Sequence, residues 1–156
     1  MTMRVLIIGG GGNKGAAGSG KLARINKEYD LGIGVSTGAL MLVPALLGDH
    51  KLLKQAYTTV TANQIFSKNP FNKNVRLKWW WAAWYILSGR PTLGESHALK
   101  NTLKKMYLDN DLWERLKGSR KVAYVGVYNM TLCRMEYISS DRVSLTDWID
   151  YTWASA

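Results

Sequence analysis

The stretch VLIIGGGGNKGAAGSGKL, residues Val5 to Leu22, decides how the rest of this chain is interpreted. Four consecutive glycines follow a short apolar run, and this run is predicted to be a β-strand over Arg4–Ile8. Glycine allows other groups to approach the backbone closely, so such a loop presents its N–H groups to something negative. Three partners fit this description: a dinucleotide, a nucleotide triphosphate, and the oxyanion of a reaction intermediate.

Two nucleotide-binding patterns match the loop only in part. Gly10, Gly12 and Gly15 satisfy G-x-G-x-x-G, but Ser36 ends the next predicted strand, where an acidic residue would hold a ribose. A G-x-x-x-x-G-K pattern also occurs, followed by Leu22 in place of the Ser or Thr that would bind Mg²⁺. Nucleotide binding is therefore the more distant alternative, and we expect no thermal shift with NADH or ATP.

A second motif, GVSTG at Gly34–Gly38, lies between a predicted strand, Leu31–Val35, and a predicted helix, Thr37–Leu47. G-x-S-x-G in this position is typical of a nucleophile elbow, a sharp turn that holds a serine in a strained conformation with its hydroxyl exposed. The glycine loop would then supply N–H donors to the tetrahedral oxyanion. The two motifs together favour acyl transfer through Ser36, and the alternative is a small residue in a tight turn.

The rest of the pattern alternates strands and helices, which is typical of a mostly parallel sheet covered by helices. A length of 156 residues predicts one domain over residues 1–156. Pro44 is expected to kink the helix after Ser36 or to end its regular part. The further predicted helices are Gly20–Glu28, Lys51–Phe66, Arg76–Leu87, His97–Leu108 and a closing helix capped by Ser144, and the further predicted strands are the hairpin Lys121–Tyr128 and Leu132–Ile138.

Composition limits the setting in which the chain works. The single cysteine, Cys133, excludes an internal disulfide and a cysteine-based zinc cluster, and it fits a reducing, intracellular setting. We expect no metal, no cofactor and a cytoplasmic location. The longest apolar run, WWWAAWYIL at Trp79–Leu87, is well short of the ~20 residues that a membrane span needs. A net charge of +10 favours an anionic partner. The chain is expected to be soluble or peripheral at a membrane.

At the glycine loop and the serine turn, the chain resembles the patatin-like phospholipases. The family's G-G-G-x-[KR]-G signature is matched by GGGNKG at Gly10–Gly15, and its G-x-S-x-G motif by Gly34–Gly38. Looser similarity extends over PTLGESHALKNTLKKMY, VGVYNMTLCRMEYISS and YTWASA. The resemblance implies a three-layer α/β domain, with a mostly parallel sheet flanked by helices, that lacks its C-terminal part.

The resemblance also implies a lipid acyl hydrolase that uses a Ser–Asp dyad without histidine or cofactor, with Ser36 as the nucleophile and Gly34 and Gly38 as the elbow glycines. The implied oxyanion hole comprises Gly10, Gly11, Gly12, Lys14 and Gly15. In the family, the dyad aspartate belongs to an Asp-Gly pair after the Ala-Ser segment. This sequence has no Asp-Gly pair, so the dyad partner is absent from it. The alternative is a non-catalytic lipid- or protein-binding remnant of the fold.

The partners implied are a phospholipid or another acyl-ester lipid at a membrane surface, and no nucleic acid. Trp79 and Trp81 are the candidate membrane contacts, because tryptophan favours the headgroup region. Trp80, Trp84 and Leu87 share one helical face and are expected to be buried. A sheet edge left by missing strands would invite a second copy of the chain or a partner that completes the sheet.

Overall fold

The structure is a computed structural model that describes residues 3–12, 15–25, 27–59, 80 and 97–156. The chain divides into two compact units, one formed by Met1–Thr59 with Leu103–Ala156 and the other by Val60–Thr102. All of the described strands belong to the first unit. The second unit contributes Trp80 and the opening residues of one helix to the described part of the chain.

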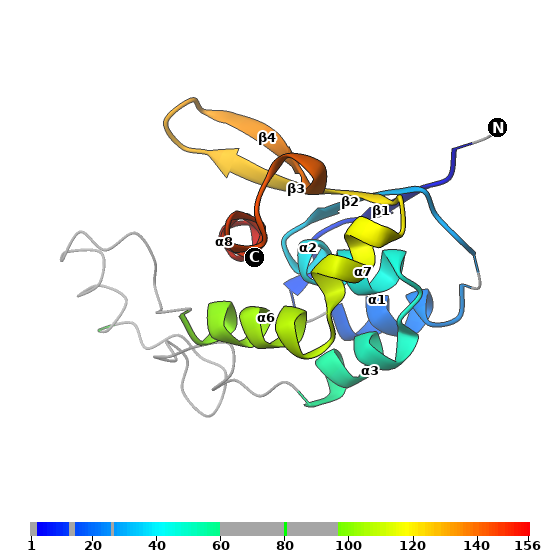
Figure 1. The fold of residues 1–156 in the computed structure, drawn as a ribbon. Helices are drawn as coiled ribbons and strands as arrows, with labels where there is room; N and C mark the ends of the chain where they lie inside the picture. Colours follow the sequence, from blue (N-terminus) through cyan, green and yellow to red (C-terminus); the bar gives the residue numbers. More distant parts are fainter. Residues whose placement is uncertain (1–2, 13–14, 26, 60–79, 81–96) are drawn as a thin grey trace. The chain divides into compact units, whose positions relative to one another are not determined.

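The first unit is built on a four-stranded sheet with the strand order β1-β2-β3-β4 (Figure 1). Its strands are β1 (Val5–Ile8), β2 (Leu31–Val35), β3 (Val122–Asn129) and β4 (Arg134–Ser139). Strands β1, β2 and β3 run parallel, and β4 pairs with β3 in the antiparallel sense. The described helices are α1 (Gly15–Leu22), α2 (Thr37–Leu46), α3 (His50–Thr59), α6 (His97–Asp109), α7 (Leu112–Gly118) and α8 (Leu145–Ser155), with the 3₁₀ turn η2 (Ser140–Arg142). The predicted α/β fold with a mostly parallel sheet is confirmed.

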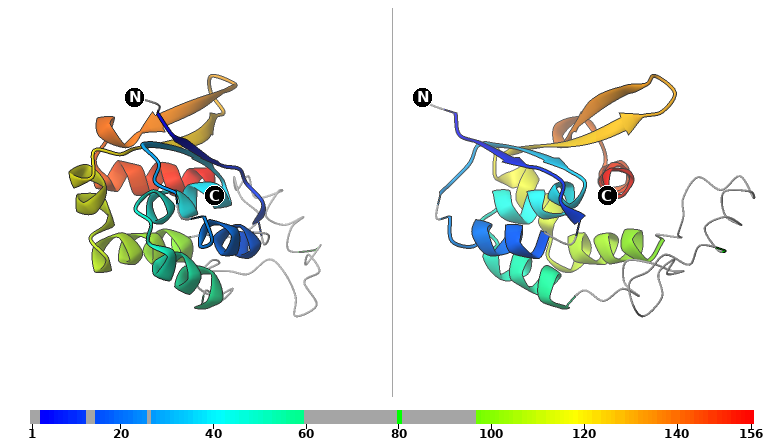
Figure 2. Two further views of the ribbon diagram at one scale, coloured as in Figure 1. Left: turned by 90° about the vertical axis from the view of Figure 1, so that its right-hand side faces the viewer. Right: turned by 180° about the vertical axis from the view of Figure 1, so that it is seen from behind.

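Helix α2 lies directly on the sheet and is the centre of the core. Nine of its ten residues are buried, as expected for a helix that is apolar on all sides. Gly32 of β2 lets the helix approach closely, because a Cβ there would lie 2.7 Å from Leu42 Cδ1 and 2.9 Å from Leu46 Cδ1. Helices α1, α3 and α7 pack on α2 on the same side of the sheet (Figures 1 and 2).

The opposite face of the sheet is apolar and exposed. Val5 and Ile7 of β1 are 43% and 72% exposed, and Tyr137 of β4 is 56% exposed. No helix in the described part of the first unit packs on this face. The described helices of the first unit therefore lie on one side of the sheet.

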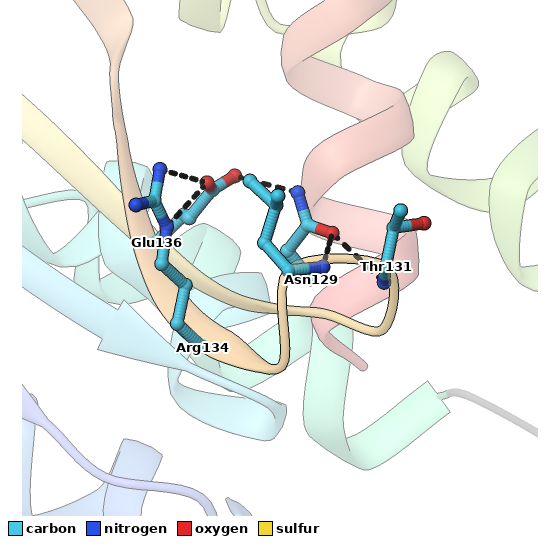
Figure 3. Close-up of polar contacts among 5 residues, drawn as sticks. Asn129, Thr131, Arg134 and Glu136 are labelled. Carbon is cyan, nitrogen blue, oxygen red and sulfur yellow. Dashed lines mark hydrogen bonds and ion pairs between the residues drawn. The ribbon is translucent and has the colours of Figure 1, made fainter.

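The β3–β4 hairpin is closed by a side-chain network around Asn129 (Figure 3). Its Oδ1 accepts hydrogen bonds from Thr131 N at 3.1 Å and Leu132 N at 3.0 Å, and its Nδ2 donates to Glu136 Oε2 at 3.2 Å. Arg134 donates to Glu136 Oε1 through Nε and a terminal nitrogen. The bond from Asn129 and then those from Arg134 hold the pKa of the Glu136 carboxyl below its usual value. The predicted hairpin is confirmed.

One helix prediction needs correction, one is confirmed, and one helix was missed. Helix α1 spans Gly15–Leu22 instead of Gly20–Glu28, since packing overrides the low helix propensity of its glycines: a Cβ at Gly18 would lie 3.3 Å from Met41 Cε. Helix α2 matches the predicted Thr37–Leu47 to within one residue and contains Pro44, and Leu46 in its last turn is only 1% exposed and packs over β2. Helix α7 was not predicted, although Leu112 and Leu116 give it a buried face.

Other predictions concern the part of the chain between α3 and α6. The predicted helix Arg76–Leu87, apart from Trp80, and the end of Lys51–Phe66 beyond residue 59 lie outside the described residues. Trp80 was expected to be buried, but its side chain is 89% exposed. Helical spacing shows which residues share a face, and it does not show whether that face meets a core.

Helix α8 is anchored by an aromatic cluster formed with α6 and α7. Trp148 is fully buried, its Nε1 donates a hydrogen bond of 2.8 Å to the Tyr107 hydroxyl, and its ring centroid lies 5.8 Å from that of Trp113. The Lys117 ammonium lies 4.8 Å from the Trp113 ring centroid, a cation–π contact. The cluster holds α8 in place, and α8 reaches the end of β2.

The Tyr107→Phe variant is expected to lose about 1–3 kcal/mol of unfolding free energy, because the buried Trp148 N–H would be left without an acceptor. Urea denaturation measures this loss. Tyr128→Phe is the matched control, since Tyr128 is 54% exposed and its variant should stay within about 0.5 kcal/mol of the wild type. Equal effects of the two substitutions would contradict the importance of the buried hydrogen bond.

Candidate active site

Ser36 lies at the junction where β2 ends and α2 begins. Its backbone has φ 54° and ψ −130°, a left-handed conformation that favours glycine. A residue other than glycine in such a region stores on the order of 1–3 kcal/mol of strain, which the surrounding structure must sustain. The strained strand-to-helix turn expected from the GVSTG motif is therefore present.

Two glycines of the motif allow the turn to pack against its neighbours. A Cβ at Gly38 would overlap the carbonyl oxygen of Ile8 and lie 2.7 Å from its carbonyl carbon. A Cβ at Gly34 would lie 2.7 Å from the Gly38 carbonyl oxygen and 2.9 Å from Ala39 Cα. Real Cβ atoms do not approach backbone atoms this closely, so both positions require glycine.

The glycine loop after β1 lies against Ser36. A Cβ at Gly10 would be 2.9 Å from Ser36 Cβ and 3.4 Å from Ser36 Oγ. Gly12, with φ +51°, accepts a hydrogen bond of 3.3 Å from the Thr37 hydroxyl through its carbonyl oxygen. The contact arises because β1 and β2 are parallel neighbours, so the loops at their carboxyl ends meet at one edge of the sheet.

The amides of this loop are available to a ligand. The N–H groups of Gly10, Gly11 and Gly12 make no hydrogen bond to any other described residue. Helix α2 begins at Thr37, so the positive end of its dipole lies at the same place. Donors and dipole together suit a developing negative charge near the Ser36 hydroxyl.

Of the remaining predicted site residues, the structure describes only some. Gly15 is buried at the start of α1, on the same connection as the glycine loop. Lys14, Trp79 and Trp81 lie outside the described residues. Within the described ranges, Ser36 Oγ forms no hydrogen bond with a carboxylate or an imidazole, and no group of three or more His, Cys, Asp or Glu is arranged to hold a metal.

At the turn the structure adds Ser155, a residue to which the sequence assigned no role. Ser36 N donates a hydrogen bond of 2.9 Å to Ser155 Oγ, and Ser155 Oγ donates one of 2.6 Å to the carbonyl oxygen of Gly126. Ser155 lies in the YTWASA segment, where the only signal was a loose similarity to the family's Ala-Ser segment. Its role depends on a contact between residues 119 positions apart in the chain.

Fold and turn together define an α/β protein with a serine held in a strained turn between a parallel strand and a buried helix. Residues 6–151 match the family of patatin-like phospholipases, and the chain belongs to this family. Membership supports lipid acyl hydrolysis at the level of the family. No curated protein and no solved structure matches the chain. None of the helices in the described ranges has both the length and the apolar character to cross a membrane.

Proposed function

We propose that this protein is a serine lipid acyl hydrolase in which Ser36 is the nucleophile. The observation that carries the proposal is the strained backbone of Ser36 in direct contact with the glycine loop. Strain at a strand-to-helix turn holds a serine hydroxyl outward, which is where an ester carbonyl can reach it. A serine with a purely structural role in a turn would gain nothing from a conformation that costs stability.

In the proposed reaction, Ser36 Oγ bonds to the carbonyl carbon of an acyl ester while its proton passes to a base. The carbonyl oxygen becomes an oxyanion, which the amides of Gly10, Gly11 and Gly12 stabilise. Loss of one such donor typically costs about 2.7–4 kcal/mol of barrier. The ester C–O bond then breaks, the alcohol leaves with a proton, and water hydrolyses the acyl-enzyme.

The base is the part of the mechanism that this sequence does not contain. By the family resemblance it is an aspartate in an Asp-Gly pair, and no such pair occurs among the 156 residues. The proposal assigns this role to a carboxylate from outside these residues. The same observation favours the second candidate function, a non-catalytic remnant that binds lipid or protein, because serine without a base is a poor nucleophile.

The proposed substrate is a phospholipid or another acyl-ester lipid at a membrane surface, reached from the cytoplasm by peripheral binding. The net charge of +10 suits an anionic headgroup layer. Trp79 and Trp81 remain the proposed contacts with that layer. Co-sedimentation of the chain with anionic vesicles, compared with zwitterionic ones, measures this binding, and equal recovery with both would remove the electrostatic part of the proposal.

A fluorophosphonate probe tests the nucleophile directly, since it reacts only with an activated serine. The probe is applied to the chain together with the source of the carboxylate that the proposed mechanism requires. This assembly is expected to be labelled, and Ser36→Ala to reduce the labelling rate by a factor on the order of 10³ or more. The matched control is Ser119→Ala, whose hydroxyl donates to the Leu116 carbonyl oxygen at the end of α7. This variant should be labelled like the wild type.

The two candidate functions give opposite results in this experiment. Labelling that Ser36→Ala removes supports the hydrolase. Absence of labelling when the source of the carboxylate is present contradicts it and favours the non-catalytic remnant. Labelling that persists in Ser36→Ala would place the reactive serine elsewhere.

A further inference from the structure

We infer that Ser155 is a positioning residue, whose hydroxyl ends the pairing of β2 with β3 at the nucleophile turn and holds the strained backbone of Ser36. The inference rests on the proposed function, because it gives the residue a part in orienting Ser36. Its basis is the pair of hydrogen bonds that joins Ser36 N, Ser155 Oγ and Gly126 O.

The pairing of β2 with β3 shows what this hydroxyl replaces. Val122 N donates to the Asp30 carbonyl oxygen, and Leu31 is the register partner of Val122. In a parallel ladder every second residue turns its N–H and C=O toward the neighbouring strand, so Gly126, four positions beyond Val122, also faces β2. Because Gly126 pairs with Val35, the next ladder bond would run from Ser36 N to Gly126 O.

Ser155 takes the place of that bond. Its Oγ accepts from Ser36 N and donates to Gly126 O, so both backbone groups keep a partner although the strands no longer pair directly. The inserted hydroxyl lets the chain leave the sheet at Ser36, where φ becomes positive, without an unsatisfied backbone group. The bridge therefore sets the direction in which the Ser36 side chain leaves the turn.

The bridge also determines which amides can serve the oxyanion. The N–H of Ser36 is already committed to Ser155, at 2.9 Å. The donors must then come from elsewhere, and the amides of Gly10, Gly11 and Gly12, which have no described acceptor, belong to the loop beside the turn. The Ser36 amide therefore has a structural role, and the amides of the glycine loop are left to bind the oxyanion.

Helix α8 brings Ser155 to this point as a rigid element. Ser155 is the last residue of the helix, and Ser144 caps the other end by accepting from Asp147 N and donating to Asp147 Oδ2. In between, the buried Trp148 is held by its hydrogen bond to Tyr107. A hydroxyl carried by an anchored helix keeps the orientation that precise positioning requires.

The test uses the full chain together with the source of the catalytic carboxylate, with three substitutions and three measurements: amide exchange, labelling and melting temperature. Amide hydrogen exchange at Ser36, followed by NMR, reports the hydrogen bond itself, and the rate of fluorophosphonate labelling reports the orientation of the hydroxyl. We expect Ser155→Ala to speed exchange of the Ser36 amide and to slow labelling, each by about tenfold or more. Ser155→Thr keeps the hydroxyl and should restore both values to near those of the wild type.

The control Ser144→Ala weakens the same helix at its other end, at Asp147, and leaves the bridge intact. It should lower the melting temperature with little change in labelling. If Ser144→Ala slows labelling as much as Ser155→Ala at a similar loss of melting temperature, the role of Ser155 is only structural and the inference is overturned. Unchanged exchange at Ser36 in Ser155→Ala, or no rescue by threonine, overturns it as well.

Failure of the proposed function is recognised separately. It appears as absence of labelling in the wild type, and the exchange measurement then decides by itself whether Ser155 holds the Ser36 backbone. If protection of the Ser36 amide is lost in Ser155→Ala and restored in Ser155→Thr, the hydroxyl at position 155 holds the Ser36 backbone.

Discussion

Replacing Gly38 by alanine is expected to lower the unfolding free energy by about 3 kcal/mol or more and to abolish probe labelling. The added Cβ would overlap the Ile8 carbonyl oxygen and lie 2.9 Å from the Gly9 carbonyl oxygen. These are backbone atoms of β1 and the glycine loop, so no side chain can rotate away to make room. Overpacking typically costs about 1–3 kcal/mol, and a clash with fixed backbone belongs at the upper end or beyond.

Urea denaturation measures the loss of stability, and Gly20→Ala is its matched control. Gly20 lies in α1, and a Cβ there would meet no atom within 4 Å. Alanine is the better helix former, so this variant should gain about 0.5–1 kcal/mol. If Gly38→Ala were as stable as Gly20→Ala, the close packing of the turn against β1 would be contradicted.

Replacing Ser36 by glycine is expected to stabilise the fold by about 1 kcal/mol while it removes labelling completely. At φ 54° the serine stores on the order of 1–3 kcal/mol of strain that glycine does not. The greater freedom of glycine in the unfolded chain offsets about 0.5–1 kcal/mol of this gain. A gain in stability coupled to a loss of reactivity is the expected mark of a site that is kept strained for its chemistry.

Ser36→Ala separates the strain from the loss of the hydroxyl. Alanine keeps the Cβ and therefore keeps the strained backbone, so its unfolding free energy should stay near that of the wild type. The difference between the glycine and alanine variants in urea denaturation then reports the backbone strain alone. A glycine variant less stable than the alanine variant would show that the turn is relaxed, which would remove the main support for Ser36 as the nucleophile.

Features that depend on neighbouring residues were predicted well. The strand Leu31–Val35 matches the observed β2 in both bounds, and the turn after it has the strained serine that GVSTG predicts. The Asn129 turn and the two strands around it form the predicted hairpin. In each case the signal lies in glycine, asparagine or β-branched residues within a few positions, where backbone sterics act locally.

Features that depend on packing were predicted poorly. Helix α1 begins five residues earlier than its glycines suggested, because Gly18 and Ser19 pack inward. Trp80 was assigned to a buried face and is exposed. Local propensity is a weak guide wherever the burial of a segment is decided by elements far along the chain.

The sequence by itself determined the chemistry offered at the turn: a serine between glycines after one parallel strand, and a run of free amides after another. Only the tertiary structure decided how these parts are held. Ser155 reaches the Ser36 amide across 119 residues, and Gly126 receives the bond that regular strand pairing would have supplied. A hydrogen bond formed by distant parts of the chain leaves no periodic or local signal, since it exists only once α8 has packed against β3.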